Sequence, residues 1–194
     1  MLSQDEKDSI LRRLRRGNAI LFNTDSELLA PLMYDLRNLG KRGIILWAFD
    51  GADQAVSRFE QLYADETVPR GTLMMSRAWA QGTVKMPQVR PLILSCHALA
   101  RSMDSREGVS LVHAIAQACS AVHAKNHAVA FLFYRLTALI HQNGKEGSWE
   151  VIESMVEQLE ERLGFWCSRA EKEHLSWAAF LPAKDRVKGK KQCL

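Results

Sequence analysis

The chain has 194 residues, of which 47% are hydrophobic and 25% are charged, and its formal net charge is +4. These values are ordinary for a globular domain and exclude wholesale disorder. The excess positive charge lies in residues 184–194, where five Lys and Arg accompany one Asp, so the high isoelectric point does not indicate a basic domain face. We expect one helical domain over residues 1–182 and a basic, disordered tail over residues 183–194.

Helix start signals open the chain. Residues 3–6 and 24–27 each have the form of a capping box, in which Ser or Thr and a Glu three residues later bond to each other's backbone N–H. The first predicts a helix that ends before Gly17. The second predicts a helix that ends at Gly40, and Pro31 either kinks this helix or stands in the first turn of a shorter one.

A strongly apolar third helix is predicted from residue 43 to residue 63. Its run Ile44–Trp47 could also form a buried strand, but no other segment offers a partner strand. Gly51 lies inside this helix, where it costs about 1 kcal/mol of helix stability relative to Ala.

The remaining helical patterns cover residues 69–82, 87–103, 107–121, 124–142, 148–163 and 169–180, with a possible break at Lys125-Asn126. The sequence therefore predicts an all-α fold, a compact bundle of about eight to nine helices with no sheet.

The four cysteines have neither a metal-ligand spacing nor a disulfide framework, which favours a reducing compartment. No apolar run approaches the roughly 20 residues that span a bilayer, and the N-terminal segment lacks a signal-peptide core. We expect a soluble, cytoplasmic protein that contacts no membrane.

Nucleic-acid binding through the N-terminal arginines is a weak third possibility, because these arginines have no aromatic interleaving.

Two sets of side chains could form a binding site. Arg90, Leu94, His97 and Arg101 recur at helical spacing and form one stripe, which suits an acidic partner because guanidinium groups match carboxylates. A solvated flank is the plainer interpretation of this stripe.

His123 and His127 are four residues apart and share a helix face, so they could bind a metal or form a polar contact between helices. A zinc site needs three or four ligands, His113 lies about 80° from the face of His123, and Lys125 disfavours a divalent cation. We therefore predict no metal, no cofactor and no catalytic residue. Whether His97 meets His123 and His127 in a pocket is a question for the tertiary structure.

Arg135 lies in an otherwise apolar run, so it must snorkel to the surface or meet an acid. Asp50, in the apolar third helix, has the same need, and we expect these two residues to pair. Arg135 completes the set of candidate binding residues.

The chain resembles a family of bacterial immunity proteins, the immunity-family-five-like group, which genome context associates with polymorphic toxin systems. The resemblance rests on four segments between residues 43 and 140: Leu46-Trp47-Ala48-Phe49-Asp50, Arg77-Ala78-Trp79-Ala80-Gln81-Gly82-Thr83-Val84-Lys85-Met86, His97-Ala98-Leu99-Ala100-Arg101 and Val122-His123-Ala124-Lys125-Asn126-His127-Ala128. It implies an all-helical fold and the neutralisation of a toxin by binding, and it brings no catalytic residues.

Two functions follow from these observations. The first is an immunity-type binding protein that recognises a partner protein, a toxin. The alternative is a small helical enzyme or a ligand- or metal-binding protein with a pocket of His and Arg side chains.

Overall fold

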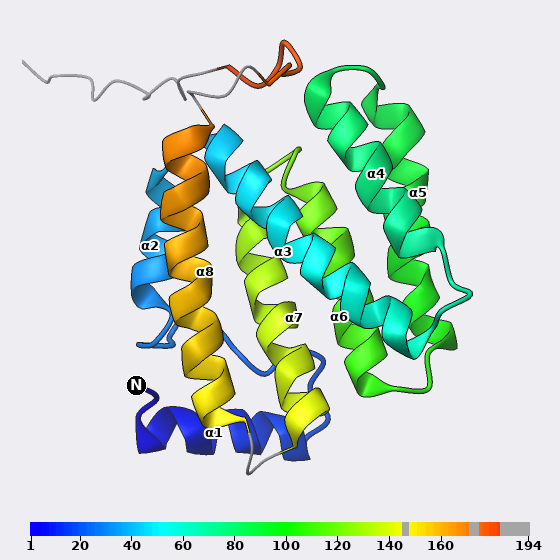
Figure 1. The fold of residues 1–194 in the computed structure, drawn as a ribbon. Helices are drawn as coiled ribbons and strands as arrows, with labels where there is room; N and C mark the ends of the chain where they lie inside the picture. Colours follow the sequence, from blue (N-terminus) through cyan, green and yellow to red (C-terminus); the bar gives the residue numbers. More distant parts are fainter. Residues whose placement is uncertain (145–147, 171–174, 183–194) are drawn as a thin grey trace, which may run out of the picture.

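The computed structural model describes residues 1–144, 148–170 and 175–182, and these residues form helices and connecting segments without any strand (Figure 1). This confirms the all-α fold and excludes a strand at residues 44–47. The elements in chain order are α1 (Gln4–Arg15), α2 (Ala30–Asn38), α3 (Lys41–Leu62), α4 (Val68–Gln81), α5 (Met86–Leu99), the short 3₁₀ helix η1 (Ala100–Ser102), α6 (Arg106–Ser120), α7 (Asn126–Asn143) and α8 (Trp149–Arg169).

Helix α6 lies at the centre of the molecule and packs against α3, α4, α5 and α7. Ten of its fifteen residues are buried, which is why its sequence is apolar on nearly every face. Figure 1 shows α3 crossing this centre, with α2 and α8 on one side, the α4–α5 hairpin on the other, and α1 across one end. The hairpin therefore reaches the rest of the molecule through α6 and α3.

An aromatic cluster lies where α3 meets α7 and α8. The Trp47 ring stands edge-on to Phe131, with centroids 5.4 Å apart. The Trp47 indole Nε1 donates a hydrogen bond of 2.9 Å to the carbonyl oxygen of Leu159. Both rings are fully buried. The one polar atom of this cluster has a hydrogen-bond partner, which offsets the cost of removing it from water.

The first capping box is confirmed: the Ser3 hydroxyl accepts from the Glu6 N–H, and the Glu6 carboxylate accepts from the Ser3 N–H. The second is wrong. Ser26 instead donates to the Glu6 carboxylate over 2.7 Å, and α2 begins only at Ala30 with Pro31 in its first turn. The predicted N-cap, Thr24, therefore lies in a turn ahead of α2 and caps no helix.

The other differences concern helix ends. α5 stops at Leu99 and continues as η1, and turns at residues 121–125 separate α6 from α7, at the position of the predicted break. A ninth helix at 169–180 is wrong for the residues described there, because α8 runs on to Arg169 and residues 175–182 are not helical. The predicted tail, 183–194, lies outside the described residues.

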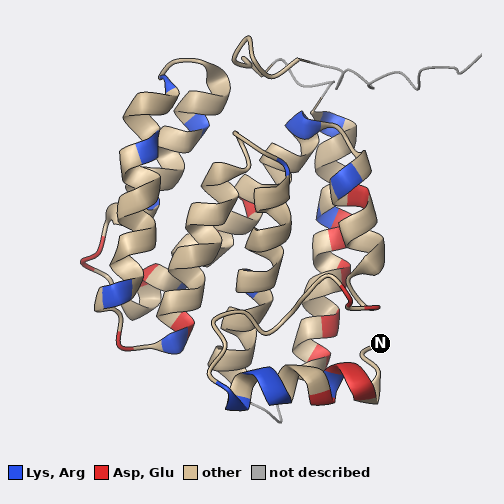
Figure 2. Cartoon of the chain, turned by 180° about the vertical axis from the view of Figure 1, so that it is seen from behind, with Lys and Arg blue, Asp and Glu red and all other residues tan. Residues whose placement is uncertain are grey.

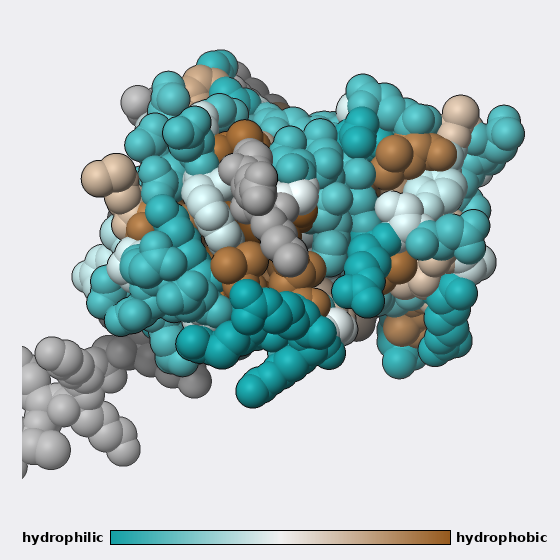
Figure 3. Space-filling model, turned by 90° about the horizontal axis from the view of Figure 1, so that it is seen from below, coloured by the Kyte–Doolittle hydropathy of each residue, from teal (hydrophilic) through white to brown (hydrophobic). Residues whose placement is uncertain are grey.

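Charged residues of both signs are distributed over the helices, as Figure 2 shows. On α1, Asp5 and Glu6 lie in the first turn and the arginines in the last, which complements the helix dipole. The end of the molecule seen in Figure 3 is mainly hydrophilic, with apolar residues in separate patches. No described helix is long and apolar enough to cross a membrane.

Candidate functional site

The fold brings the predicted histidines to one surface hollow, which we name the histidine groove. It lies between the α4–α5 hairpin and the turn that joins α6 to α7, and its volume is about 250 Å³. Its lining consists of Trp79, Met86, Arg90, Ile93, Leu94, His97, Ser120, His123 and His127. The Arg90–Leu94–His97 stripe on α5 therefore faces the groove, and four of the six candidate residues meet there.

His97 makes a contact that the sequence did not predict. Its Nδ1 lies 2.9 Å from the Nδ1 of His113 on α6, and the His113 and Tyr134 rings have centroids 5.0 Å apart with their planes tilted by 34°. In this geometry one imidazole donates and the other accepts, so the pair holds a single proton between the two nitrogens. His123 lies in the turn between α6 and α7, so the helix face that we predicted for His123 and His127 is wrong, and the two residues meet at the groove through the fold. The helical period gave no information about His97, which lies on another helix.

The other two histidines are held separately. The Nδ1 of His127 lies 2.6 Å from the Gln117 side-chain oxygen and therefore donates to it, which leaves Nε2 as the acceptor nitrogen. Lys41 donates to the His123 carbonyl oxygen over 2.9 Å. Lys125 donates to the carbonyl oxygens of Arg37 and Leu39 at the end of α2, so its ammonium group belongs to a helix C-terminus.

The surroundings favour neutral imidazoles. Burial lowers the pKa of His97, and the nearby His113 and His127 lower it further. Burial likewise lowers the pKa of His113 and of His127, and His123 adds to the effect on His127. Arg90 is the one permanently charged side chain in the lining of the groove.

The described residues contain no group of three or more His, Cys, Asp or Glu side chains placed to hold a metal ion. Cys96 and Cys119 are fully buried between helices. Burial raises the pKa of both thiols, that of Cys119 to about 12, which makes them poor nucleophiles at neutral pH.

The remaining two candidates lie elsewhere. Arg101 is exposed on η1, where the end of α5 carries it away from the groove. Arg135 is buried on α7, and its Nη1 has no hydrogen-bond partner among the described residues. The predicted Asp50–Arg135 pair is wrong: both carboxylate oxygens of Asp50 accept from Arg162 over 2.8 Å, and Glu107 is the acid that acts on Arg135.

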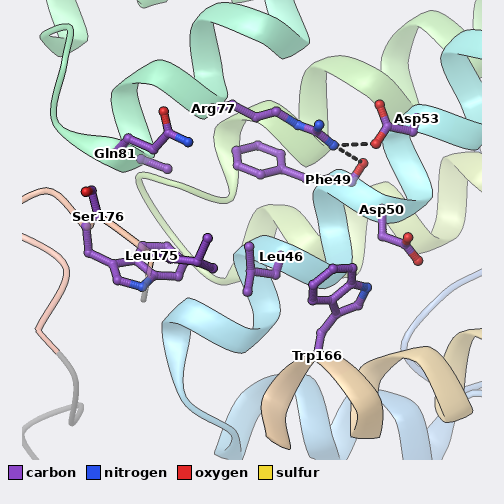
Figure 4. A pocket seen from close by; sticks show the side chains of 11 residues that line it. Leu46, Phe49, Asp50, Asp53, Arg77, Gln81, Trp166, Leu175 and Ser176 are labelled. Atoms are coloured by element: carbon purple, nitrogen blue, oxygen red, sulfur yellow. Dashed lines mark hydrogen bonds and ion pairs between the residues drawn. The ribbon is translucent and has the colours of Figure 1, made fainter. Parts of the chain in front are cut away.

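A second hollow, which we name the tryptophan pocket, has a volume of about 320 Å³ and was not predicted. α3 and α4 form one side of it, and Trp166 of α8 with the segment 175–177 forms the other (Figure 4). Its lining consists of Leu46, Phe49, Asp50, Asp53, Arg77, Ala80, Gln81, Trp166, Leu175, Ser176 and Trp177.

Arg77 organises the polar side of this pocket. Its guanidinium donates to the Asp53 carboxylate and, over 3.4 Å, to the Phe49 carbonyl oxygen, and it lies 5.6 Å from the Phe49 ring centroid (Figure 4). The segments at 46–50 and 77–86, which carried the family resemblance, contain most of the α3 and α4 lining. These motifs mark the walls of the pocket in the sequence. The periodicity of each segment could not show that α3 and α4 face each other here.

The fold and these two hollows define the class: an all-helical protein with a basic, histidine-containing groove and a separate aromatic pocket. A model of the family described as Imm-5 like putative immunity protein matches residues 35–162, which is well over half of the chain. The chain belongs to this family. No curated protein and no solved structure matches it.

Proposed function

We propose that this protein neutralises a toxin by binding it, and that the histidine groove is the surface that makes the contact. Membership of an immunity protein family supports an immunity-type role. The choice of surface rests on Arg90. This arginine is exposed and forms no hydrogen bond or ion pair with any described residue.

The surroundings of Arg90 suit a protein partner. Leu94 is 52% exposed and Met86 is 39% exposed, so two large apolar side chains flank the guanidinium. Interfaces enrich Arg and Met and place apolar anchors at their centre. A toxin segment with an acidic residue beside an apolar one would pair with Arg90 and cover Leu94 together.

The test measures, by calorimetry at fixed salt, the affinity of the full chain for a toxin domain identified among the products of the neighbouring genes. Arg90→Ala and Leu94→Ala are each expected to weaken binding by about tenfold or more, as for residues at an interface centre. Thermal unfolding should stay nearly unchanged, because both side chains are exposed.

Arg101→Ala is the matched control, since Arg101 is also an exposed arginine but does not line the groove. It should leave the affinity within about twofold, as expected of a residue outside the contact. Unchanged affinity in an Arg90→Ala, Leu94→Ala double variant would remove the groove from the proposal.

Ligand binding in the same groove is the second candidate, because His97, His123 and His127 do line it together with Arg90. An experiment without the toxin distinguishes the two functions. A ligand site would retain a small molecule when the protein is purified without any partner, and mass spectrometry of the native protein would detect it.

A further inference from the structure

The lining of the histidine groove contains basic and titratable side chains but no acid. Its polar side chains are those of Arg90, His97, Ser120, His123 and His127, and no Asp or Glu is among the lining residues. The pKa values of His97 and His127 are lowered by burial and by neighbouring histidines, and no carboxylate of the described residues offsets these effects. The groove therefore keeps these two imidazoles neutral and provides no counter-charge for Arg90.

His97 can accept a proton without losing its contact with His113. Its Nδ1 lies 2.9 Å from the His113 Nδ1, and its Nε2 has no hydrogen-bond partner among the described residues. When both nitrogens of His97 carry protons, its Nδ1 donates to a neutral His113, so one positive charge is compatible with the hydrogen bond. The neighbouring Tyr134 stays neutral, because burial raises its pKa.

His127 has the same property. Its Nδ1 lies 2.6 Å from the Gln117 side-chain oxygen and donates to it, so a further proton would bind to Nε2. That proton leaves the bond to Gln117 in place and makes it a charge-assisted bond. Lys41 and Lys125, which lie at this turn, donate to backbone carbonyl oxygens and do not line the groove.

A carboxylate in the groove would act against burial at these histidines. An opposite charge within about 4–6 Å favours the charged form of an imidazole. A carboxylate inside a hollow of about 250 Å³ lies close to the imidazoles of its lining. Binding of an acidic group at His97 and His127 is therefore expected to bring protons with it.

The spacing along α5 indicates the form of such a segment. Arg90 and His97 lie seven residues apart, about 10.5 Å along the helix axis, and the exposed Leu94 lies between them. Two acids that flank one apolar residue are about 6.6 Å apart in an extended segment, and their own side chains supply the remaining reach.

We infer that the histidine groove binds a segment in which two acidic residues flank an apolar one, with uptake of protons at His97 and His127. This inference rests on the proposed function, because it specifies the partner segment and its pH dependence. One acid pairs with Arg90 and the apolar residue covers Leu94. The other acid accepts hydrogen bonds from the charged imidazoles. Groups that bind protons more tightly in the complex make the affinity rise as the pH falls.

The imidazole signals of the ¹⁵N-labelled full chain test the inference, with the peptide acetyl-Glu-Leu-Glu-amide as the probe. His97→Gln and His127→Gln assign the two signals. The peptide should bind at pH 6 with a Kd of about 1 mM or lower and raise both titration midpoints by about 1 pH unit. Its affinity should be about tenfold higher at pH 5.5 than at pH 8. The neutral peptide acetyl-Gln-Leu-Gln-amide should move neither midpoint.

His141→Gln is the matched control, since burial also lowers the pKa of His141 but this residue does not line the groove. It should leave the tenfold pH effect intact, whereas His97→Gln should reduce it to about threefold by removing one of two proton acceptors. If His97→Gln does not fold, His127→Gln takes its place, because it removes the other acceptor.

The inference is overturned if the acidic peptide does not bind, if it binds equally at both pH values, or if the neutral peptide acts in the same way. Inorganic phosphate that moves the midpoints as strongly at the same concentration would also overturn it, because the groove would then accept any anion. Toxin binding that depends on Arg90 but not on pH would remove this inference alone. Toxin binding that is insensitive to both Arg90→Ala and Leu94→Ala would remove the proposed surface as well.

Discussion

Gly51 weakens the helix in which it lies, yet it is buried in the core, and the packing around it explains why. It lies in the middle of α3, and a Cβ atom built there would be 2.4 Å from the Phe131 ring. Trp47, one turn earlier, holds that ring edge-on. The absence of a side chain therefore lets α3 and α7 approach closely enough for the aromatic pair to form.

We expect Gly51→Ala to destabilise the protein by about 1–3 kcal/mol, because overpacking a rigid ring outweighs the gain in helix propensity. Urea unfolding of the full chain measures this change. Gly71→Ala is the control: Gly71 is also inside a helix, with nothing within 4 Å of its Cβ position. That variant should gain up to about 1 kcal/mol, and equal effects of the two substitutions would contradict the packing argument.

Arg135 and Asp50 show the opposite case, in which residue-level reasoning failed. Both needed a partner, and the sequence suggested each other. Asp50 instead meets Arg162, 112 residues away on α8, and Arg135 lies near Glu107, whose carboxylate Arg58 already binds. The need for a partner could be inferred from local sequence, but the identity of the partner depends on helix packing.

At the scale of elements, the junction of α5, α6 and α7 is where the histidines gather. His97 contributes from α5, His113 from α6 and His127 from α7, and burial lowers the pKa of all three. The shared proton between His97 and His113 ties α5 to α6 only while one of the two rings is neutral. Charging both rings would replace an attraction with a repulsion.

This junction should make stability depend on pH. Each folded-state pKa is below the ordinary value near 6.5, so between those values the unfolded chain binds more protons than the folded chain. The stability is fully present above about pH 6.5 and falls as the pH drops through the lowered folded values. Urea unfolding from pH 8 to pH 5 measures this loss, above the range where carboxylates titrate.

The variant His97→Gln, His113→Gln is the comparison for that experiment. It removes the titrating pair, so its stability should change less between pH 8 and pH 5 than that of the unaltered chain. A parallel loss in both proteins would mean that the pair is not the source of the pH dependence.

The same scale shows what sequence can predict about elements. The Ser3 capping box formed as expected because both of its residues lie within one turn. The box at residues 24–27 did not form, and Glu6 of α1 instead binds the Ser26 hydroxyl and the Leu28 N–H in that segment. Local signals are reliable until a side chain from a distant segment holds the backbone in another conformation.

At the scale of the whole molecule, the segment 175–182 is part of the structure although it is not helical. Leu181 and Ala178 are buried, and the Phe180 ring contacts Trp79 in a tilted arrangement with centroids 5.8 Å apart. This segment closes the tryptophan pocket against α3 and α4. The boundary of the folded domain is therefore expected after residue 182, as the composition predicted.

Two truncated chains test this boundary. Ending the chain after Pro182 should leave the thermal unfolding midpoint unchanged and remove the excess positive charge. Ending it after Ala170 removes Leu181, and full burial of one such side chain stabilises by about 1.5–3 kcal/mol, so the midpoint should fall by several degrees. Identical midpoints for the two truncations would show that segment 175–182 does not contribute to stability.

The sequence by itself determined the helical class, the positions of most helices, the family and the stripe Arg90–Leu94–His97, because periodicity, caps and motifs are local properties. Only the tertiary structure decided that His97 meets His113, that Arg162 pairs with Asp50, and that α3, α4 and Trp177 enclose a pocket. These contacts join helices far apart in the chain, and their geometry follows from how side chains pack around α6 rather than from any one segment.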